Sequence, residues 1–142
     1  MRLVGLAGLS AALVLLSPAQ AAGDAASDRQ SLIKHVGGAT KAGAAIAKGE
    51  VPFDAVAALL VLRTLNGAGL GFGYMFPDGS ETGADTEASP KIWSDRAGFD
   101  AAVAKFVTDT SANVSDLDSF KAAFGAATSN CGACHKAYRV KK

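Results

Sequence analysis

Apolar residues recur every three or four positions along four stretches of this 142-residue chain, the spacing of an amphipathic helix. The spacing predicts helices from about residue 25 to 48, from about 52 until it fades in the glycine-rich stretch 67–73, from Ser94 or Asp95 onward, and from Ser115 toward the C-terminus. Ser115 with Asp118 resembles a capping box at the start of the last helix. Strand patterns are limited to short apolar fragments. The chain is therefore predicted to be all-α, most simply an antiparallel four-helix bundle.

Residues 76–90 form the one long predicted loop. Pro77-Asp78-Gly79-Ser80 is typical of a turn, and residues 81–89 are small and polar. Loops of this length inside a compact domain are often functional. The loop either covers part of a bound group or is a solvated crossover between helices.

Residues 1–21 have the composition of a cleavable signal peptide. Met1-Arg2 is a short positive start, residues 3–16 are almost wholly apolar, and Ala19-Gln20-Ala21 provides a small-x-small cleavage site. The apolar run is short for a membrane span, and no other segment is expected to cross a bilayer. We expect cleavage after Ala21, leaving one exported, soluble domain of residues 22–142 that is periplasmic in a bacterium. An uncleaved N-terminal anchor is the alternative.

The charge balance excludes a strong electrostatic preference for nucleic acid or for an anionic membrane. The chain has 14 Lys and Arg residues against 13 Asp and Glu, and loss of Arg2 with the signal peptide makes the numbers equal. Basic residues do gather near the C-terminus, at positions 136, 139, 141 and 142. They are interpreted as a solvated helix end, which the helix dipole favours, with a docking patch as the alternative.

The last predicted helix contains Cys131-Gly132-Ala133-Cys134-His135, the C-x-x-C-H pattern that attaches a c-type haem. The two thiols add to the two vinyl groups of haem, and the imidazole takes an axial position on the iron. On a helix these side chains stand at i, i+3 and i+4 and share one face. One covalently bound haem c is therefore predicted. A thiol–disulfide redox pair is the alternative, although such pairs open a helix after a strand and no βαβ pattern surrounds this one.

A four-helix bundle with its haem motif on the last helix resembles the cytochrome c′ family. The resemblance covers nearly the whole mature chain and rests on four stretches in order: Arg29-Gln30, Lys48-Gly49-Glu50 with Pro52-Phe53-Asp54, Pro90-Lys91-Ile92-Trp93-Ser94-Asp95, and the ending from Cys131 to Arg139. It implies thioether links at Cys131 and Cys134 and a proximal iron ligand at His135. Arg139 would lie beside that imidazole, or would act only as a cation at the helix end.

The resemblance also implies residues that approach the haem from the first helix and the loop. Arg29 would pair with a haem propionate, to which its planar fork is suited. Gln30, Thr86 and Glu87 occupy positions that lie near the haem in relatives. For Thr86 and Glu87, a solvated surface position is the alternative.

The distal side of the haem is predicted to be apolar. Ile33 lies one helical turn after Arg29, where low-spin relatives carry a methionine that completes six-coordinate iron, and Ile33 has no lone pair to donate. Met75, the only methionine outside the signal peptide, is expected to pack among aromatic residues, and His35 faces about 200° away from Ile33 around the helix. The iron is therefore expected to be five-coordinate and high-spin, with a six-coordinate low-spin electron carrier as the alternative.

An apolar open site favours NO and CO over O₂, because it offers bound O₂ no hydrogen bond. The resemblance likewise implies binding of NO and CO, and electron transfer is the second class of function. A multi-step enzyme is not expected, since the sequence shows no distal His/Arg pair of the peroxidase kind. The resemblance further implies a homodimer formed through the first two helices.

Overall fold

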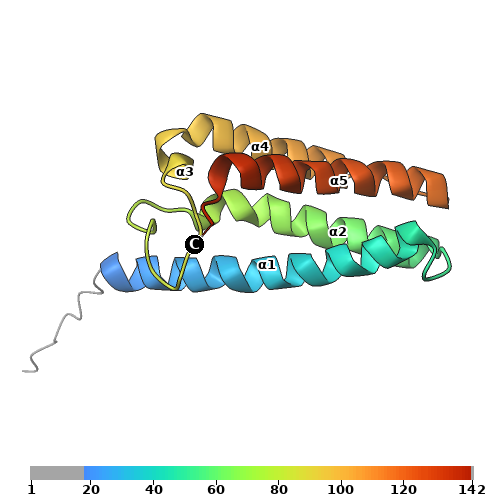
Figure 1. Cartoon of the computed structure of the whole chain (residues 1–142), viewed down its shortest axis with the longest axis horizontal. Coiled ribbons are helices and arrows are strands. Elements are labelled where there is room, and N and C mark those ends of the chain that lie inside the picture. The colour runs from blue at the N-terminus through green and yellow to red at the C-terminus, as the bar shows by residue number, and fades with distance from the viewer. Residues whose placement is uncertain (1–17, 142) are drawn as a thin grey trace, which may run out of the picture.

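The computed structural model describes residues 18–141, with their side chains from Ala25 onward, so the predicted positive start and apolar run of the signal peptide lie outside the described residues. The helices are α1 (Pro18–Lys48), α2 (Ala55–Phe72), the 3-10 helix η1 (Gly73–Met75), α3 (Lys91–Ser94), α4 (Arg96–Thr110) and α5 (Leu117–Tyr138) (Figure 1). The residues described contain no β-strand, only an isolated bridge between Ala88 and Arg139. The predicted all-α four-helix bundle is confirmed.

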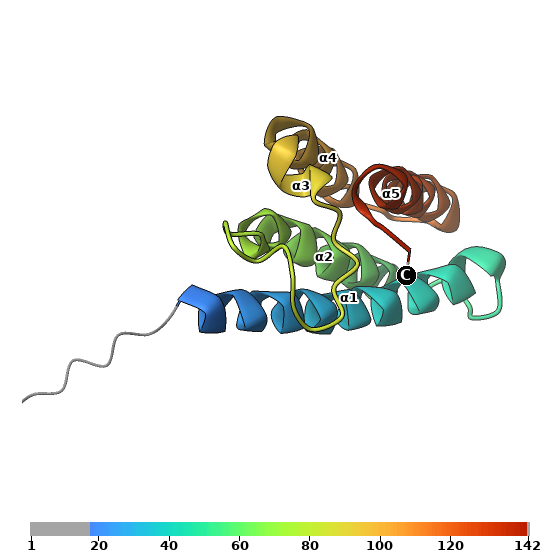
Figure 2. The ribbon, with the colours of Figure 1, turned by 60° about the vertical axis from the view of Figure 1, so that its left-hand side comes forward.

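The four long helices form two layers, α1 with α2 and α4 with α5 (Figure 2). Contacts are extensive between α1 and α2, between α2 and α4, and between α4 and α5, whereas α1 and α5 touch over a shorter stretch. The loop 76–90 and the end of α5 lie at the same end of the bundle (Figure 1). Near Gly43 and Phe124 α1 and α5 are in direct contact, whereas a cavity separates residues 26–40 of α1 from residues 130–138 of α5, so the bundle is closed at one end and open between these two helices at the other.

Aspartate side chains begin three of the helices. Asp54 accepts a hydrogen bond from the Ala57 amide at 2.7 Å, and Asp95 accepts one from the Gly98 amide at 3.3 Å, which confirms the predicted start of the third long helix. The capping box of α5 lies one residue later than predicted. Asp116 and Ser119 form it, in place of Ser115 and Asp118, because Asp116 is the residue with extended backbone at the helix start.

Two boundaries differ from the prediction. The first helix begins at Pro18, seven residues earlier than expected, since the alanine-rich sequence favours helix. The second helix does not fade at Gly67 but continues to Phe72. Gly69 explains why the glycines are tolerated: a Cβ atom built there would lie 2.8 Å from the Phe106 ring, so the missing side chain lets α2 and α4 approach closely.

The core consists of two clusters, one at each end of the bundle. The cluster at the closed end includes Leu62, Leu65, Phe120 and Phe124, and the one at the open end consists of Phe76, Ile92, Phe99 and Tyr138. In the second cluster the Phe76 and Phe99 rings pack edge to face with centroids 4.9 Å apart. This aromatic cluster lies beside the open end and forms part of the wall of the cavity described below.

One segment beyond the N-terminus is long and apolar enough to cross a bilayer, judged by length and composition alone, so the expectation that there is none is wrong. Ala55–Met75 meets that measure, because it contains one charged residue, Arg63, and many alanines and leucines. Only 28% of its most apolar window is buried inside the chain. As a bundle helix packed on α1 and α4, it buries one face in the core and leaves another apolar face exposed.

Candidate haem site

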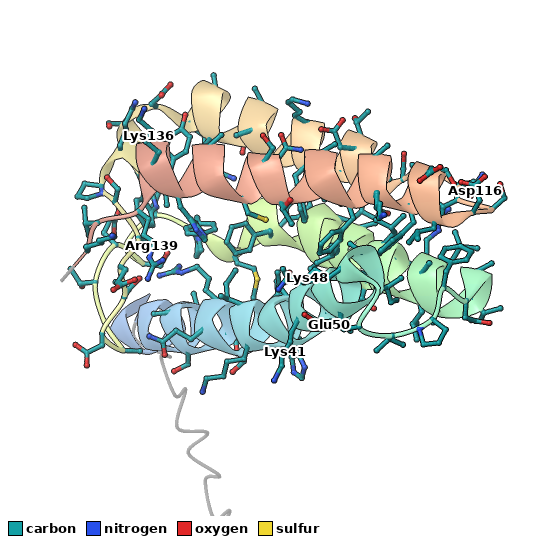
Figure 3. The ribbon with its side chains drawn as sticks, turned by 45° about the vertical axis from the view of Figure 1, so that its right-hand side comes forward. Lys41, Lys48, Glu50, Asp116, Lys136 and Arg139 are labelled. Atoms are coloured by element: carbon teal, nitrogen blue, oxygen red, sulfur yellow. The ribbon has the colours of Figure 1, made fainter. Side chains whose placement is uncertain are left out.

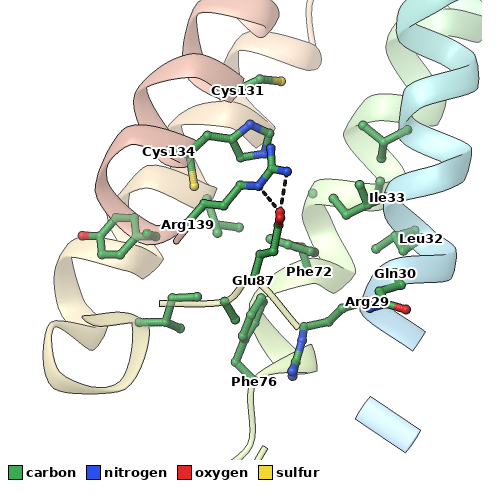
Figure 4. Close-up of a pocket in the computed structure, with 18 of the residues that line it drawn as sticks. Arg29, Gln30, Leu32, Ile33, Phe72, Phe76, Glu87, Cys131, Cys134 and Arg139 are labelled. Atoms are coloured by element: carbon green, nitrogen blue, oxygen red, sulfur yellow. Dashed lines mark hydrogen bonds and ion pairs between the residues drawn. The ribbon is translucent and has the colours of Figure 1, made fainter. Parts of the chain in front are cut away.

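A cavity of about 660 Å³ lies at the open end of the bundle, bounded by α1, α2, α4, α5 and the loop 76–90 (Figure 4). Its walls are mostly apolar and include Ile33, Val36, Phe72, Phe99, Val103 and Phe106. Polar groups gather at the mouth, among them Gln30, Thr86, Glu87 and Arg139. Volume and lining are those of a site for a largely apolar organic group that keeps a polar edge toward solvent.

The three residues of the C-x-x-C-H motif all line this cavity from α5. Cys131 and Cys134 are half-buried free thiols, and His135 is the more exposed of the three. The one-face arrangement predicted from their spacing is therefore present. Two thiols and an imidazole along one wall of a largely apolar cavity are the donor set that a covalently attached haem requires, so the residues fit the group.

The thiols lack the features of a redox-active pair. Burial raises the pKa of Cys131, and burial together with the neighbouring Cys131 raises the pKa of Cys134. Reactive cysteines have a lowered pKa, as at the N-terminus of a helix, whereas these two lie in the last third of α5. The geometry therefore favours haem attachment over thiol–disulfide exchange.

Arg139 and Glu87 form an ion pair at the mouth of the cavity. The Glu87 carboxylate accepts from both Nε and a terminal nitrogen of Arg139, as Figure 4 shows. The pair influences His135: burial and the charge of Arg139 lower the pKa of the imidazole, while the charge of Glu87 opposes that change. Arg139 turns inward while Lys136 points outward (Figure 3), so these two basic residues do not share one surface.

Arg29 is buried, and its guanidinium is hydrogen-bonded to other residues of the protein. Its guanidinium donates to the Met75 carbonyl at 2.7 Å, to the Ser80 hydroxyl at 3.0 Å and to the Ser80 carbonyl at 2.8 Å, and it lies over the Phe76 ring. Burial lowers its pKa, and the charge of Glu81 opposes this. These bonds leave two of its five N–H groups for other partners. Arg29 thus fixes the start of the loop to α1, a role that the predicted propionate partnership did not include.

Ser80, which accepts hydrogen bonds from Arg29, has no sequence signal beyond its place in the turn. Ser80 is fully buried, and its hydroxyl also donates to the Pro77 carbonyl at 2.8 Å. The turn Pro77-Asp78-Gly79-Ser80 was visible as a turn, but only the tertiary structure shows that a turn serine meets an arginine 51 positions earlier.

The middle of the loop reaches back across the cavity mouth. The Gln30 amide donates to the Ala84 carbonyl, and residues 86–89 are half-buried while residues 82–85 are exposed. Thr86 and Glu87 line the cavity, so neither is a wholly solvated surface residue. The loop thus combines the two readings that the sequence left open: it is exposed at its tip and covers the cavity at its second half.

Among the residues that the structure describes, the wall facing α5 carries no methionine or histidine side chain. Ile33 projects from α1 across the cavity from the cysteines (Figure 4). Met75 packs against the aromatic cluster and does not line the cavity, which matches its predicted packing role. His35 is exposed and does not line it either.

Comparison with known proteins agrees with this site. The sequence profile of the family described as Cytochrome C′ matches residues 24–139. Cytochrome c-556 of Agrobacterium fabrum is 40% identical over 118 residues, which cover 80% of each chain. The structure of cytochrome c′ from Rhodopseudomonas palustris superposes with a TM-score of 0.79 at 38% identity, covering 84% of this chain and 98% of that one. A nitric oxide complex of a variant of cytochrome c prime from Alcaligenes xylosoxidans superposes with a TM-score of 0.69 at 32% identity, covering 85% and 97%.

Proteins of this family carry a covalently bound c-type haem and are mainly electron carriers or gas binders. Profile, sequence relatives and solved structures all span the bundle and the C-terminal haem motif together. The chain belongs to the cytochrome c′ family.

Proposed function

We propose that this protein is a periplasmic cytochrome whose haem is attached to Cys131 and Cys134, has His135 as its only axial protein ligand, and binds NO and CO at the opposite face. The observation that carries the proposal is the aliphatic wall of α1 across from His135, where Ile33 stands and neither Met75 nor His35 faces the cavity. A bound haem supplies an iron that binds diatomic ligands and exchanges one electron.

The residues around the cavity divide into three tasks. Cys131 and Cys134 would hold the group in place, and His135 on α5 would bind its iron. Ile33 and Phe72 exclude water from the other face and offer no hydrogen bond, which disfavours O₂ relative to NO and CO. The nitric oxide complex of the Alcaligenes xylosoxidans relative supports this choice of ligand.

Electron transfer is the second candidate function. The similarity to cytochrome c-556 supports it, and so does the exposure of His135 at the open end of the bundle, which leaves the site accessible to a partner protein. Electron exchange needs such an exposed site but no distal ligand cavity. The two functions therefore predict different responses to added gas.

The deciding experiment is the optical spectrum of the protein made in a host that attaches c-type haem, in ferric and ferrous forms, with and without CO and NO. High-spin spectra in both forms that shift with either gas are the expected result. Low-spin spectra unchanged by CO would establish a sixth ligand and an electron carrier. A protein without a Soret band would contradict the haem proposal itself.

We also propose that the protein is a homodimer joined through α1 and α2. Exposed apolar side chains follow one face of α2 and the turn after it, namely Val56, Leu60, Leu70 and Tyr74, the last 88% exposed. Their spacing places them on one face of the helix, where Arg63 and Gly67 lie between the two apolar pairs. Exposed apolar side chains gathered on one helical face are typical of a surface that binds another protein. Relatives of this family commonly dimerise through these two helices.

Light scattering of the purified protein tests the dimer. Leu60→Glu should convert it to a monomer, because the buried carboxylate would lack a partner. The matched control is Ala101→Glu on the exposed face of α4, which should leave the mass unchanged. A wild-type monomer at all concentrations would contradict the proposal. Mass spectrometry of the exported protein tests the periplasmic assignment, with a mature chain beginning at Ala22 as the expected result.

A further inference from the structure

The second half of the loop is fixed to the end of α5 by backbone hydrogen bonds. The Ser89 amide donates to the Tyr138 carbonyl at 3.0 Å, and the Val140 amide donates to the Glu87 carbonyl at 2.9 Å. These bonds lie on either side of the bridge between Ala88 and Arg139. The backbone pairing of residues 87–89 with residues 138–140 therefore already places the Glu87 and Arg139 side chains side by side.

Because of this backbone pairing, the ion pair between Glu87 and Arg139 differs from an ordinary surface ion pair. Exposed pairs are weak because two long side chains lose conformational freedom when they meet. Here a single oxygen of Glu87, Oε2, lies against both Nε and Nη2 of Arg139, so two nitrogens of the guanidinium are held at one point. Contacts between two charged groups are stronger than those between neutral ones. Among the described residues, Arg139 donates to no other side chain, so Glu87 alone determines where its charge lies.

Glu87 holds the charge of Arg139 close to His135, the proposed axial ligand. Arg139 follows His135 by one helical turn, its amide donates to the His135 carbonyl at 3.2 Å, and both residues line the cavity with Glu87. A shift of the guanidinium toward solvent would carry its positive charge away from that ligand.

We propose that Glu87 is a positioning residue that holds the Arg139 guanidinium beside His135 and thereby sets the effect of that charge on the reduction potential of the site. The inference rests on the proposed function, since it takes His135 as the axial ligand. A positive charge near the iron favours the ferrous form, which carries one positive charge fewer than the ferric form. Without Glu87, the guanidinium has no fixed partner and moves into solvent, where its charge is screened.

The test compares the loss of Arg139 with and without Glu87. The reduction potential is measured by optical titration for the wild type, Arg139→Gln, Glu87→Ala and the double variant, all as haem-loaded full chains. Lys136→Gln, alone and combined with Glu87→Ala, is the matched control, because it removes the same charge from the same end of α5 at a residue that points away from the cavity. Thermal unfolding midpoints establish that each variant is folded.

Arg139→Gln should lower the potential in the wild type and have a much smaller effect once Glu87 is absent, while Lys136→Gln should have the same small effect in both backgrounds. This non-additivity is the mark of positioning, since two independent charges would contribute additively. Equal shifts for Arg139→Gln in both backgrounds, or no shift in either, would overturn the proposal. Failure of the underlying haem assignment is separately visible, because the wild-type spectrum would then lack a haem band or the signature of a histidine ligand.

Discussion

Gly43 of α1 lies directly against the ring of Phe124 of α5. A Cβ atom built on Gly43 would be 2.4 Å from one ring carbon, well inside the contact distance of two carbon atoms. This is the closed end of the bundle, where the two helices touch, and from here they diverge toward the cavity. The absence of one side chain therefore helps determine how the site opens at the other end.

Gly43→Ala should destabilise the protein by about 1–3 kcal/mol, although alanine is the better helix former. The Phe124 ring belongs to the buried cluster and is stacked on Phe120, so it cannot turn away freely. The free energy of unfolding, from urea titration of the holoprotein, measures the effect. Gly125→Ala, at an exposed position of α5, is the control: nothing lies within 4 Å of its new methyl group, so it should be neutral or stabilising by up to about 1 kcal/mol. A stabilised Gly43→Ala variant would mean that α1 and α5 are farther apart than described.

The fold was predictable from sequence because the signals that determine it are local. Apolar residues spaced by three and four positions predicted the helices of the bundle. Asp95 caps α4, at one of the two positions where a helix start was predicted. The signals failed where tertiary packing overrides local preference. The glycine-rich stretch 67–73 predicted that the second helix fades there, yet the close contact with Phe106 at Gly69 favours continuation of α2 to Phe72.

The candidate site divides in the same way. The C-x-x-C-H motif is contiguous, and its spacing alone placed three side chains on one face. The pairings of Arg29 with Ser80 and of Glu87 with Arg139 join positions 51 and 52 residues apart, and no local pattern marks them. Residues that approach the cavity could be named from the family resemblance, but which of them bind each other depends on the path of the loop.

Replacement of Ala84 by glycine should stabilise the protein. Its φ of 40° and the φ of 52° at Asp85 lie in the left-handed region, which costs a residue with a Cβ atom about 1–2 kcal/mol. Ala84→Gly removes that cost and adds backbone entropy to the unfolded chain, for an expected net gain of about 0.5–1 kcal/mol. Calorimetry of the holoprotein measures the change. Ala101→Gly, on an exposed helical face, should lose about 1 kcal/mol, and a similar loss at Ala84 would contradict the described loop conformation.

Asp116 should make stability depend on pH in the acidic range. Hydrogen bonds from the backbone and side chain of Ser119 lower its pKa below the ordinary value of 3.8. A carboxyl group whose pKa is lower in the folded state stabilises that state fully above its unfolded pKa. The contribution is lost as the pH falls through the folded pKa.

Asp116→Asn isolates this contribution, because asparagine caps helices about as well as aspartate but does not titrate. The two proteins should have similar urea midpoints at about pH 7, and the difference in pH response should appear only below about pH 4. There the wild type should lose more stability than the variant. Parallel curves for wild type and variant down to about pH 2 would show that the cap does not couple to folding.

Ile33→Met should convert the site from five-coordinate to six-coordinate iron. Ile33 is 44% exposed and projects into the cavity from α1, so a longer, unbranched side chain at this position has room to extend toward the face opposite His135. A thioether there supplies the lone pair that isoleucine lacks. The expected spectrum is low-spin in both oxidation states, with CO binding lost or strongly slowed. Ile33→Leu, with the same number of carbon atoms and no lone pair, should remain high-spin and bind CO. A Met variant that stays high-spin would place Ile33 away from the iron and identify another residue as the distal wall.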